Sequence, residues 1–265
     1  MFQGFYNLAS GILYQNRNLN VISNNMVNSN TPGYKSDRLV STTFKDEMLY
    51  RSGNRDKSNS VEVGSVSMMR AARTMETSYE QGSMDETGGN LDFALTKPGF
   101  FMIQDSDGNK VYTRNGSFSI DSEGYLCQSS QGRVLGEDGN PIEMPTDHIT
   151  VDQSGNIYEA PIQGVATEEG SDNDQEATLI GKIGVVDFED YSQLVKGDNG
   201  TFTTTAEATA ADGGIQWKNL ERSNLDPIEE MTSMLSSQRA SQSAAQVLKI
   251  YDQLMSKVVT DIGRV

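Results

Sequence analysis

The chain has 265 residues, of which 35% are apolar and 22% charged, so it has room for one large domain or two small ones with a modest core. Its formal net charge of −16 argues against a general binder of nucleic acid or of acidic membranes, because both attract a basic surface. With a single cysteine, Cys127, and a single histidine, His148, the chain has neither an intrachain disulfide nor a metal site rich in His or Cys.

The charge is unevenly distributed along the chain. Residues 1–40 carry a net +2 and residues 221–265 a net −1, which leaves −17 for the residues between them. No stretch approaches 18 consecutive apolar residues, and the first 15 residues lack the features of a secretory signal. We therefore expect either a cytoplasmic protein or one exported by a route that does not read such a signal.

The first predicted element is a helix from about Phe2 to Met26. Its apolar residues follow a heptad pattern, which indicates an amphipathic helix. They are Phe5, Leu8, Ile12, Leu19, Ile22 and Met26. The helix is expected to end in the turn Thr31, Pro32, Gly33 and Tyr34, because the residue before a proline disfavours the helical conformation and Pro-Gly favours a turn.

Asparagine is unusually frequent in this helix. Residues 1–30 contain eight asparagines, among them Asn24, Asn25 and Asn28, and Arg17 is the only charge in residues 1–34. Asparagine lowers helix propensity, so the segment should be marginal in isolation. Amides both donate and accept hydrogen bonds, so they can pair with their own copies without charge repulsion. The pattern predicts a helix that folds when it packs among identical neighbours.

The central residues change to short extended runs separated by turns. Asp-Gly, Asn-Gly and similar pairs bound these runs, and Asp107-Gly108 lies between "GFFMIQ" and "KVYTR". This spacing predicts an antiparallel sheet or barrel at about residues 88–218. Residues 51–60 are predicted to form a polar loop and residues 167–177 an exposed acidic excursion.

The last predicted element is a helix that starts after Asp226. Asp226 suits the N-cap, Pro227 suits the first helical position, and acidic residues follow in the first turn. Its heptad stripe comprises Ile228, Met231, Leu235, Ala245, Leu248, Met255, Val259 and Ile262, with Gln238, Gln242 and Asp252 at polar positions. Periodicity alone leaves open whether the two terminal helices form a hairpin within one chain or contact other copies.

Catalytic signatures are weak. One His, one Cys and no Gly-x-Ser-x-Gly provide no recognisable nucleophile–base system, and no phosphate loop or dinucleotide fingerprint is present. His148 is expected on a surface or turn, and Cys127 in a half-buried strand. We expect no enzyme, no cofactor and no metal. The alternatives are a soluble carbohydrate-active enzyme with paired carboxylates and a surface ligand-binding module with a helical hairpin.

Three segments carry a family resemblance. They are "VISNNMVNSNTPGYK" (21–35), "LDFALTKPGFFMIQDSDGNKVYTRNGSFSIDSEGYL" (91–126) and "NLERSNLDPIEEMTSMLSSQRASQSAAQVLKIYDQLM" (219–255). In this order they resemble the N-terminal, central and C-terminal motifs of bacterial flagellar rod and hook proteins. Met26 and Val27 replace the usual Leu-Ala, and Ser241 replaces a common aromatic residue. The chain length is closer to the proximal or distal rod proteins than to the longer hook protein.

The resemblance implies an α+β fold, with N- and C-terminal heptad helices paired as a coiled-coil-like domain and a mainly antiparallel β-domain. We expect residues 1–32 with 224–265 to form the helical assembly domain, 33–87 an extended arm, and 88–223 a β-rich outer domain. It further implies a structural subunit that polymerises into a helical tube, transmits torque and encloses the export channel.

The implied partners are copies of this chain, other rod and hook proteins and the flagellar type III export apparatus, with no nucleic acid and no small-molecule substrate. The implied location is the basal body, outside the cytoplasm, after export without a cleaved signal peptide. Phe44 and Met48 fit a candidate export-gate segment. The expected subunit-interface residues are Phe5, Leu8, Ile12, Leu19, Ile22, Asn24, Asn25, Met26, Asn28, Met231, Leu235, Gln238, Arg239, Gln242, Ala245, Leu248, Met255 and Val259.

Overall fold

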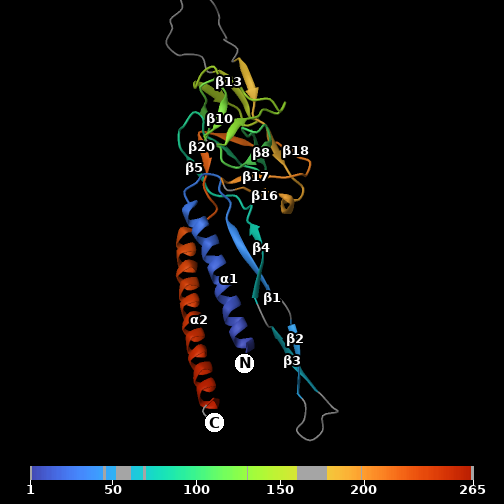
Figure 1. The fold of residues 1–265 in the computed structure, drawn as a ribbon. Helices are drawn as coiled ribbons and strands as arrows, with labels where there is room; N and C mark the ends of the chain where they lie inside the picture. Colours follow the sequence, from blue (N-terminus) through green and yellow to red (C-terminus); the bar gives the residue numbers. More distant parts are fainter. Residues whose placement is uncertain are drawn as a thin grey trace, which may run out of the picture. The chain divides into compact units, whose positions relative to one another are not determined.

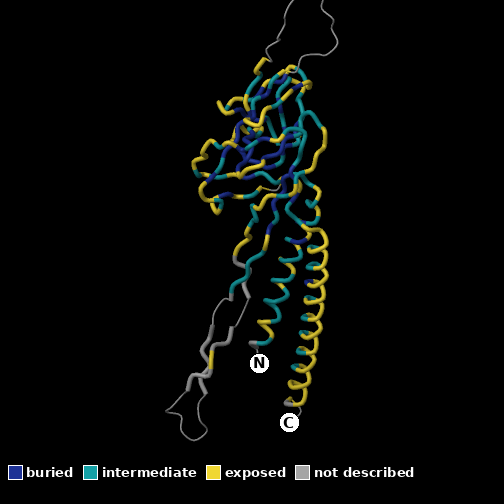
Figure 2. The backbone as a smooth tube through the Cα atoms, turned by 180° about the vertical axis from the view of Figure 1, so that it is seen from behind, coloured by how far each residue is buried: buried dark blue, intermediate teal, exposed yellow. Residues whose placement is uncertain are grey.

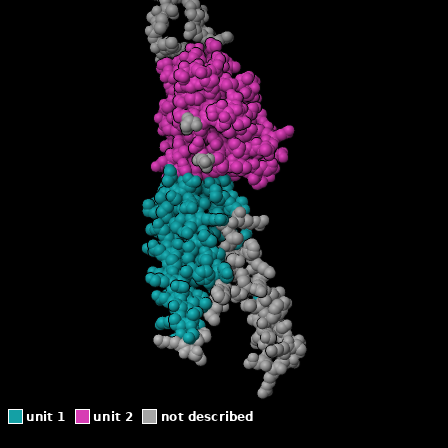
Figure 3. Space-filling model, viewed as in Figure 1, with its two compact units in different colours: residues 1–27, 36–78, 225–265 teal, residues 28–35, 79–224 magenta. Residues whose placement is uncertain are grey.

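The computed structural model describes residues 2–43, 46–51, 61–67, 70–129, 131–159, 178–197 and 199–263. A long helix at each end and antiparallel strands between them confirm the predicted α+β fold (Figure 1). The chain divides into two compact units, shown in Figure 3. Residues 1–27, 36–78 and 225–265 form the helical unit, and residues 28–35 and 79–224 form the β-unit.

The helical unit contains two helices and two strand pairs. Its elements are α1 (Phe2–Val27), β1 (Asp37–Thr43), β2 (Asp46–Arg51), β3 (Val61–Ser67), β4 (Arg70–Thr77) and α2 (Pro227–Ile262). Strand β1 pairs with β4 and β2 with β3, both antiparallel. Helix α1 lies beside an antiparallel α2 and also contacts β1 and β4 (Figure 1). The first helix is therefore covered on more than one side within its own chain.

Local sequence signals explain where the helices begin and end. The Asp226 carboxylate accepts a hydrogen bond from the Ile228 backbone N–H at 2.9 Å, and Pro227 occupies the first turn, as the sequence predicted. Helix α1 ends at Val27, and the Thr31 N–H donates to the Asn28 carbonyl (3.1 Å) in the turn that follows. In the described part of the chain, no helix combines the length and apolar character needed to span a membrane.

The β-unit is built from short antiparallel strands. They are β5 (Met84–Glu86), β6 (Phe93–Leu95), β7 (Phe100–Gln104), β8 (Lys110–Thr113), β9 (Ser119–Ile120), β10 (Leu126–Gln128), β11 (Gly132–Val134), β12 (Ile149–Val151), β13 (Asn156–Glu159), β14 (Leu179–Lys182), β15 (Val185–Asp187), β16 (Val195–Lys196), β17 (Thr201–Thr203), β18 (Thr209–Ala210), β19 (Ile215–Trp217) and β20 (Asn219–Glu221), with a short 3-10 helix at Tyr191–Gln193. The largest sheet follows the order β16-β17-β8-β7-β11-β10-β9, and β15 joins it at β7. The predicted runs "GFFMIQ" and "KVYTR" form the β7–β8 hairpin.

Strand β7 lies at the centre of the core. Phe101 packs in one hydrophobic cluster with Phe93 and Leu126, whereas Phe100 and Met102 pack in a second one. Successive side chains of a strand point to opposite faces, so one strand supplies both clusters. The predicted loop at 51–60, apart from Arg51, and the acidic excursion at 167–177 lie outside the described residues.

Candidate functional site

The seam between α1 and α2 includes small and polar side chains among its apolar ones. Asn18 Nδ2 donates to Ser237 Oγ at 3.0 Å. Nearer the start of α1, a Cβ added at Gly4 would lie 3.5 Å from the Tyr251 hydroxyl oxygen. Small residues let helix backbones approach closely, but they bury little apolar surface. The hydrophobic contribution to the helical unit therefore comes from larger residues such as Ile22, which is 5% exposed, and the half-buried Leu19 and Met234.

Asn25 joins the end of α1 to two other elements. Its side chain is 2% exposed. Nδ2 donates to the Asp37 carbonyl (2.9 Å) and to Glu230 Oε1 (3.1 Å), while Oδ1 accepts from the Asp37 N–H (3.1 Å). Burial raises the pKa of the Glu230 carboxyl, and the hydrogen bond from Asn25 opposes that shift. The single Asn25 amide thus forms hydrogen bonds to both backbone groups of Asp37, at the start of β1, and to the Glu230 carboxylate of α2.

Asn25→Leu is expected to destabilise the helical unit by about 1–3 kcal/mol, because buried Asp37 backbone groups lose their partners. The better helix propensity of leucine acts in the other direction but contributes less than about 0.7 kcal/mol. Thermal loss of the circular dichroism signal at 222 nm measures the effect. Asn20→Leu is the matched control on the exposed face of α1. Equal melting of the two variants would contradict the role given to Asn25.

Most of α2 is exposed (Figure 2). Several of its exposed residues are large and apolar. In its first half, Ile228, Met231 and Leu235 are 78%, 56% and 49% exposed at heptad spacing. A second exposed group in its later half comprises Val247, Ile250, Leu254 and Val258. These side chains lie beside the seam with α1 rather than in it, where half-buried residues such as Met234 and Ala244 are found. Helix α2 therefore presents apolar surface that its own chain leaves uncovered.

Helix α1 also has an exposed face. Tyr6, Leu13 and Val27 are its exposed large apolar residues besides Phe5. Between them the exposed positions include Asn16, Asn20 and Asn24. Asn18 and Asn25 make hydrogen bonds to other parts of the chain, and Asn16, Asn20 and Asn24 are exposed positions of the same helix.

The predicted interface residues are buried, half-buried or exposed in the single chain. Ile22 and Asn25 are buried within the chain. The half-buried members are Leu8, Ile12, Leu19, Met26, Asn28, Leu248 and Met255. The exposed members are Phe5, Asn24, Met231, Leu235, Gln238, Arg239, Gln242, Ala245 and Val259. Phe44 lies outside the described residues, and of Met48 only the backbone, in β2, is described.

The predicted turn after α1 lies in the β-unit. Thr31 and Pro32 are half-buried, whereas Gly33 and Tyr34 are buried. Gly33 has a φ of 67°, and a Cβ at this position would lie 2.3 Å from the Arg114 carbonyl carbon, so only glycine fits. Its N–H donates to the Glu221 carbonyl at 2.7 Å. The turn is thereby fixed against β20.

A buried charge cluster holds the same region together. Lys35, Arg114 and Glu221 are 2%, 5% and 1% exposed. Glu221 accepts from Lys35 Nζ and from Arg114 Nε, each at 2.7 Å, and also from the Gly82 N–H at 3.0 Å. Burial lowers the pKa of Lys35, and Glu221 opposes this shift. We call these three residues the junction cluster.

Sequence reasoning missed the junction cluster, because Lys35 and Glu221 are 186 residues apart. One feature of the sequence could have indicated the cluster. Each of the three motif segments, 21–35, 91–126 and 219–255, contributes one member of the cluster. A charge that falls inside a motif rather than in a polar loop is a candidate for such a buried pair.

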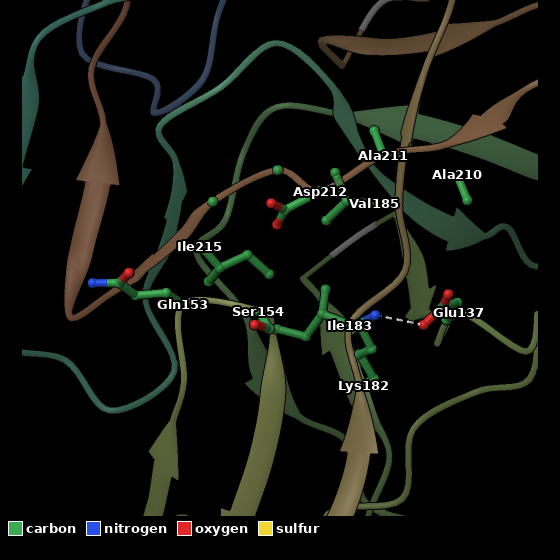
Figure 4. Close-up of a pocket in the computed structure, with 12 residues that line it drawn as sticks. Glu137, Gln153, Ser154, Lys182, Ile183, Val185, Ala210, Ala211, Asp212 and Ile215 are labelled. Atoms are coloured by element: carbon green, nitrogen blue, oxygen red, sulfur yellow. Dashed lines mark ion pairs between the residues drawn. The ribbon is translucent and has the colours of Figure 1, made fainter.

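A cavity of about 270 Å³ lies elsewhere in the β-unit (Figure 4). Two carboxylates that line it form ion pairs with lysines. Glu137 pairs with Lys182 at 2.7 Å, and Asp212 pairs with Lys97 at 2.8 Å. The hydrogen bond from Lys97 keeps the pKa of Asp212 below its usual value. A catalytic acid of a glycosidase instead requires a raised pKa. Asp212 at this cavity is therefore suited to an ion pair rather than to proton donation.

The remaining candidate groups occupy ordinary positions. His148 is exposed beside β12, and Cys127 is a half-buried residue of β10 with its Sγ 3.4 Å from Ser119 Oγ. Among the described residues, no three His, Cys, Asp or Glu side chains gather in a way that could hold a metal ion.

Comparisons with known proteins match the three motif regions separately. Residues 5–35 match the model "Flagella basal body rod protein", and residues 94–159 match "Flagellar hook protein FlgE/F/G D1 domain". Residues 218–261 match "Flagellar basal body rod FlgEFG protein C-terminal". The three models occur in the order predicted from the sequence, and their residue ranges include all members of the junction cluster.

Whole-length relatives agree with these matches. The flagellar basal-body rod protein FlgF of Caulobacter vibrioides is 32% identical over 254 residues, which cover 94% of this chain and 93% of the relative. The flagellar basal-body rod protein FlgG of Bacillus subtilis is 30% identical over 275 residues and 98% of both chains. FlgG of Buchnera aphidicola from Schizaphis graminum is 28% identical over 261 residues. This chain therefore belongs to the family of flagellar basal-body rod proteins, which are structural proteins of the flagellum.

Proposed function

We propose that copies of this chain polymerise through the helical unit into a helical tube, which transmits torque and encloses the export channel of the rod. The observation that carries this proposal is the apolar surface left exposed on α2, at Ile228, Met231 and Leu235 and at Val247, Ile250, Leu254 and Val258. Helices of globular proteins usually bury their apolar stripes, and larger exposed patches mark interaction sites. A neighbouring copy would cover these side chains.

The outward face of α1 suits contact with its own copies. Asn16, Asn20 and Asn24 alternate there with apolar residues, and Arg17 is the only charge on the helix. Amides on neighbouring copies can exchange hydrogen bonds, whereas repeated charges would repel. A contact between different faces of successive copies produces an open helical filament when its rotation does not close.

The charge distribution supports an outer position for the β-unit. The ends of the chain are nearly neutral, and the residues between them carry about −17. Like-charged β-units on neighbouring copies would repel one another, so close packing is favoured at the helices. We therefore assign residues 1–32 with 224–265 to assembly, 33–87 to an arm and 88–223 to the outer domain. The exposed and half-buried members of the predicted interface set are assigned to contacts between copies.

The proposal includes other partners. Further rod and hook proteins adjoin the filament, and the type III export apparatus delivers the chain outside the cytoplasm. Phe44 and Met48 are the candidate segment for the export gate. The relatives are named flagellar basal-body rod proteins, and these names support a location in the basal-body rod.

Hydrogen–deuterium exchange on the monomer and on the assembled filament tests the proposal. Both helices leave large apolar side chains exposed in the single chain, so residues 2–27 and 227–262 should exchange more readily than the β-unit core in the monomer. Burial among neighbouring copies should protect them in the filament. Strands β7 and β8 provide the internal control, because their core side chains are already buried within the single chain. Helices that are as protected in the monomer as β7 would refute the proposal.

A further inference from the structure

A second, smaller cavity of about 130 Å³ opens beside the junction cluster, within the β-unit. Lys35 and Arg114 both line it, and Tyr79, Gln81 and Tyr191 contribute polar groups. Gln81 is exposed, so the cavity has access to solvent, whereas the two cations are almost fully buried. Among the described residues that line this cavity there is no carboxylate.

The junction cluster is not electrically balanced. Two cations, Lys35 and Arg114, share the single carboxylate of Glu221. The nearby Asp187 carboxylate already accepts a hydrogen bond from the Tyr191 hydroxyl at 2.7 Å. An unpaired buried charge is strongly unfavourable. Burial lowers the pKa of Lys35 most, Glu221 opposes this shift, and the Arg114 charge adds a smaller lowering effect.

Both cations retain unused hydrogen-bond donors. Lys35 Nζ donates to Glu221 and to the Glu80 carbonyl (2.7 Å), which accounts for two of its three hydrogens. Arg114 donates through Nε to Glu221 and through Nη1 to the Gly99 carbonyl. Its Nη2 has no acceptor among the described residues. An ammonium and a guanidinium with donors to spare are the groups that bind phosphate and carboxylate oxygens most strongly.

We propose that this cavity binds a small oxyanion, a phosphate or a free carboxylate, between Arg114 and Lys35. The anion supplies the negative charge that the junction cluster lacks and uses the remaining donors of both cations. Since Lys35, Arg114 and Glu221 come from three distant segments, the bound anion stabilises the β-unit where these segments meet. The site is independent of polymerisation through the helices.

Thermal unfolding of the full chain tests the site. Trp217, the only tryptophan, lies in β19 and reports on the β-unit by its fluorescence. Millimolar sodium phosphate is compared with sodium chloride at equal ionic strength and pH. We expect a saturable rise in Tm of roughly 3–6 °C when phosphate exceeds its Kd about tenfold. Sodium acetate forms a second arm, in which a saturable rise shows that the site accepts carboxylates as well as phosphate.

Two matched variants separate specific binding from a general salt effect. Gln81→Glu places a carboxylate at the cavity and should abolish the phosphate-dependent rise. Gln153→Glu adds the same charge at an exposed position that does not line this cavity, and it should retain the rise. A 31P line-width titration of the unmodified chain decides the question without any variant. Absence of saturable broadening, or an equal rise in Tm for Gln81→Glu, would overturn the proposal.

Discussion

Glu221→Gln is expected to lower the free energy of unfolding of the β-unit by about 3–5 kcal/mol. The substitution keeps the size of the side chain, and its amide oxygen can still accept from Gly82. It removes the charge that faces Lys35 and Arg114, which are only 2% and 5% exposed. Urea unfolding followed by Trp217 fluorescence measures the loss.

An exposed ion pair provides the control for Glu221→Gln. Asp212→Asn removes the partner of Lys97, but these side chains are 71% and 56% exposed, so the expected change is about 0–1 kcal/mol. Lys35→Met should also have a smaller effect in the Glu221→Gln background than alone, because the two residues interact directly. If Glu221→Gln and Asp212→Asn shift the urea midpoint equally, the cluster has no special stabilising role.

Leu235→Glu is expected to raise the concentration needed for filament assembly at least tenfold. Burial of a leucine side chain at an interface contributes about 1.5–3 kcal/mol, and burial of an unpaired carboxylate is unfavourable in addition. Each 1.4 kcal/mol corresponds to about a factor of ten. Leu235 is 49% exposed in the single chain, so folding of the monomer should change little. Sedimentation and electron microscopy of assembled filaments measure the outcome.

The neighbouring residue supplies the control for Leu235→Glu. Ser236→Glu introduces the same charge at an exposed position of α2 about 100° around the helix, outside the stripe formed by Ile228, Met231 and Leu235. We expect this variant to assemble nearly normally. Should the two variants assemble alike, the stripe would not be a contact between copies.

The uncharged character of α1 has two physical origins. Part of the helix is covered within the chain by α2, β1 and β4, where Asn18 and Asn25 make defined hydrogen bonds. The other part, with Asn16, Asn20 and Asn24, faces outward. The sequence pattern alone predicted contacts between copies for the whole asparagine set. The fold shows that at least two members of this set bond within their own chain.

Local chemistry determined much of this protein from the sequence alone. Asp226 and Pro227 mark the start of α2, because capping and a fixed proline φ depend only on adjacent residues. The Asp-Gly pair between β7 and β8 marks a hairpin for the same reason, with Gly108 at a φ of 81°. The three ordered motifs also identified the flagellar rod family.

Only the tertiary structure decided which face of α2 contacts α1. Helix α2 carries apolar residues on more than one stripe, so periodicity alone does not show which stripe packs against α1. The small residues at the seam, such as Ser237 and Ala244, were less conspicuous than Ile228 or Leu235, which face outward. The junction cluster was equally hidden, because a buried ion pair depends on distance in space and on dehydration. Neither quantity is encoded locally when the partners, Lys35 and Glu221, lie 186 residues apart.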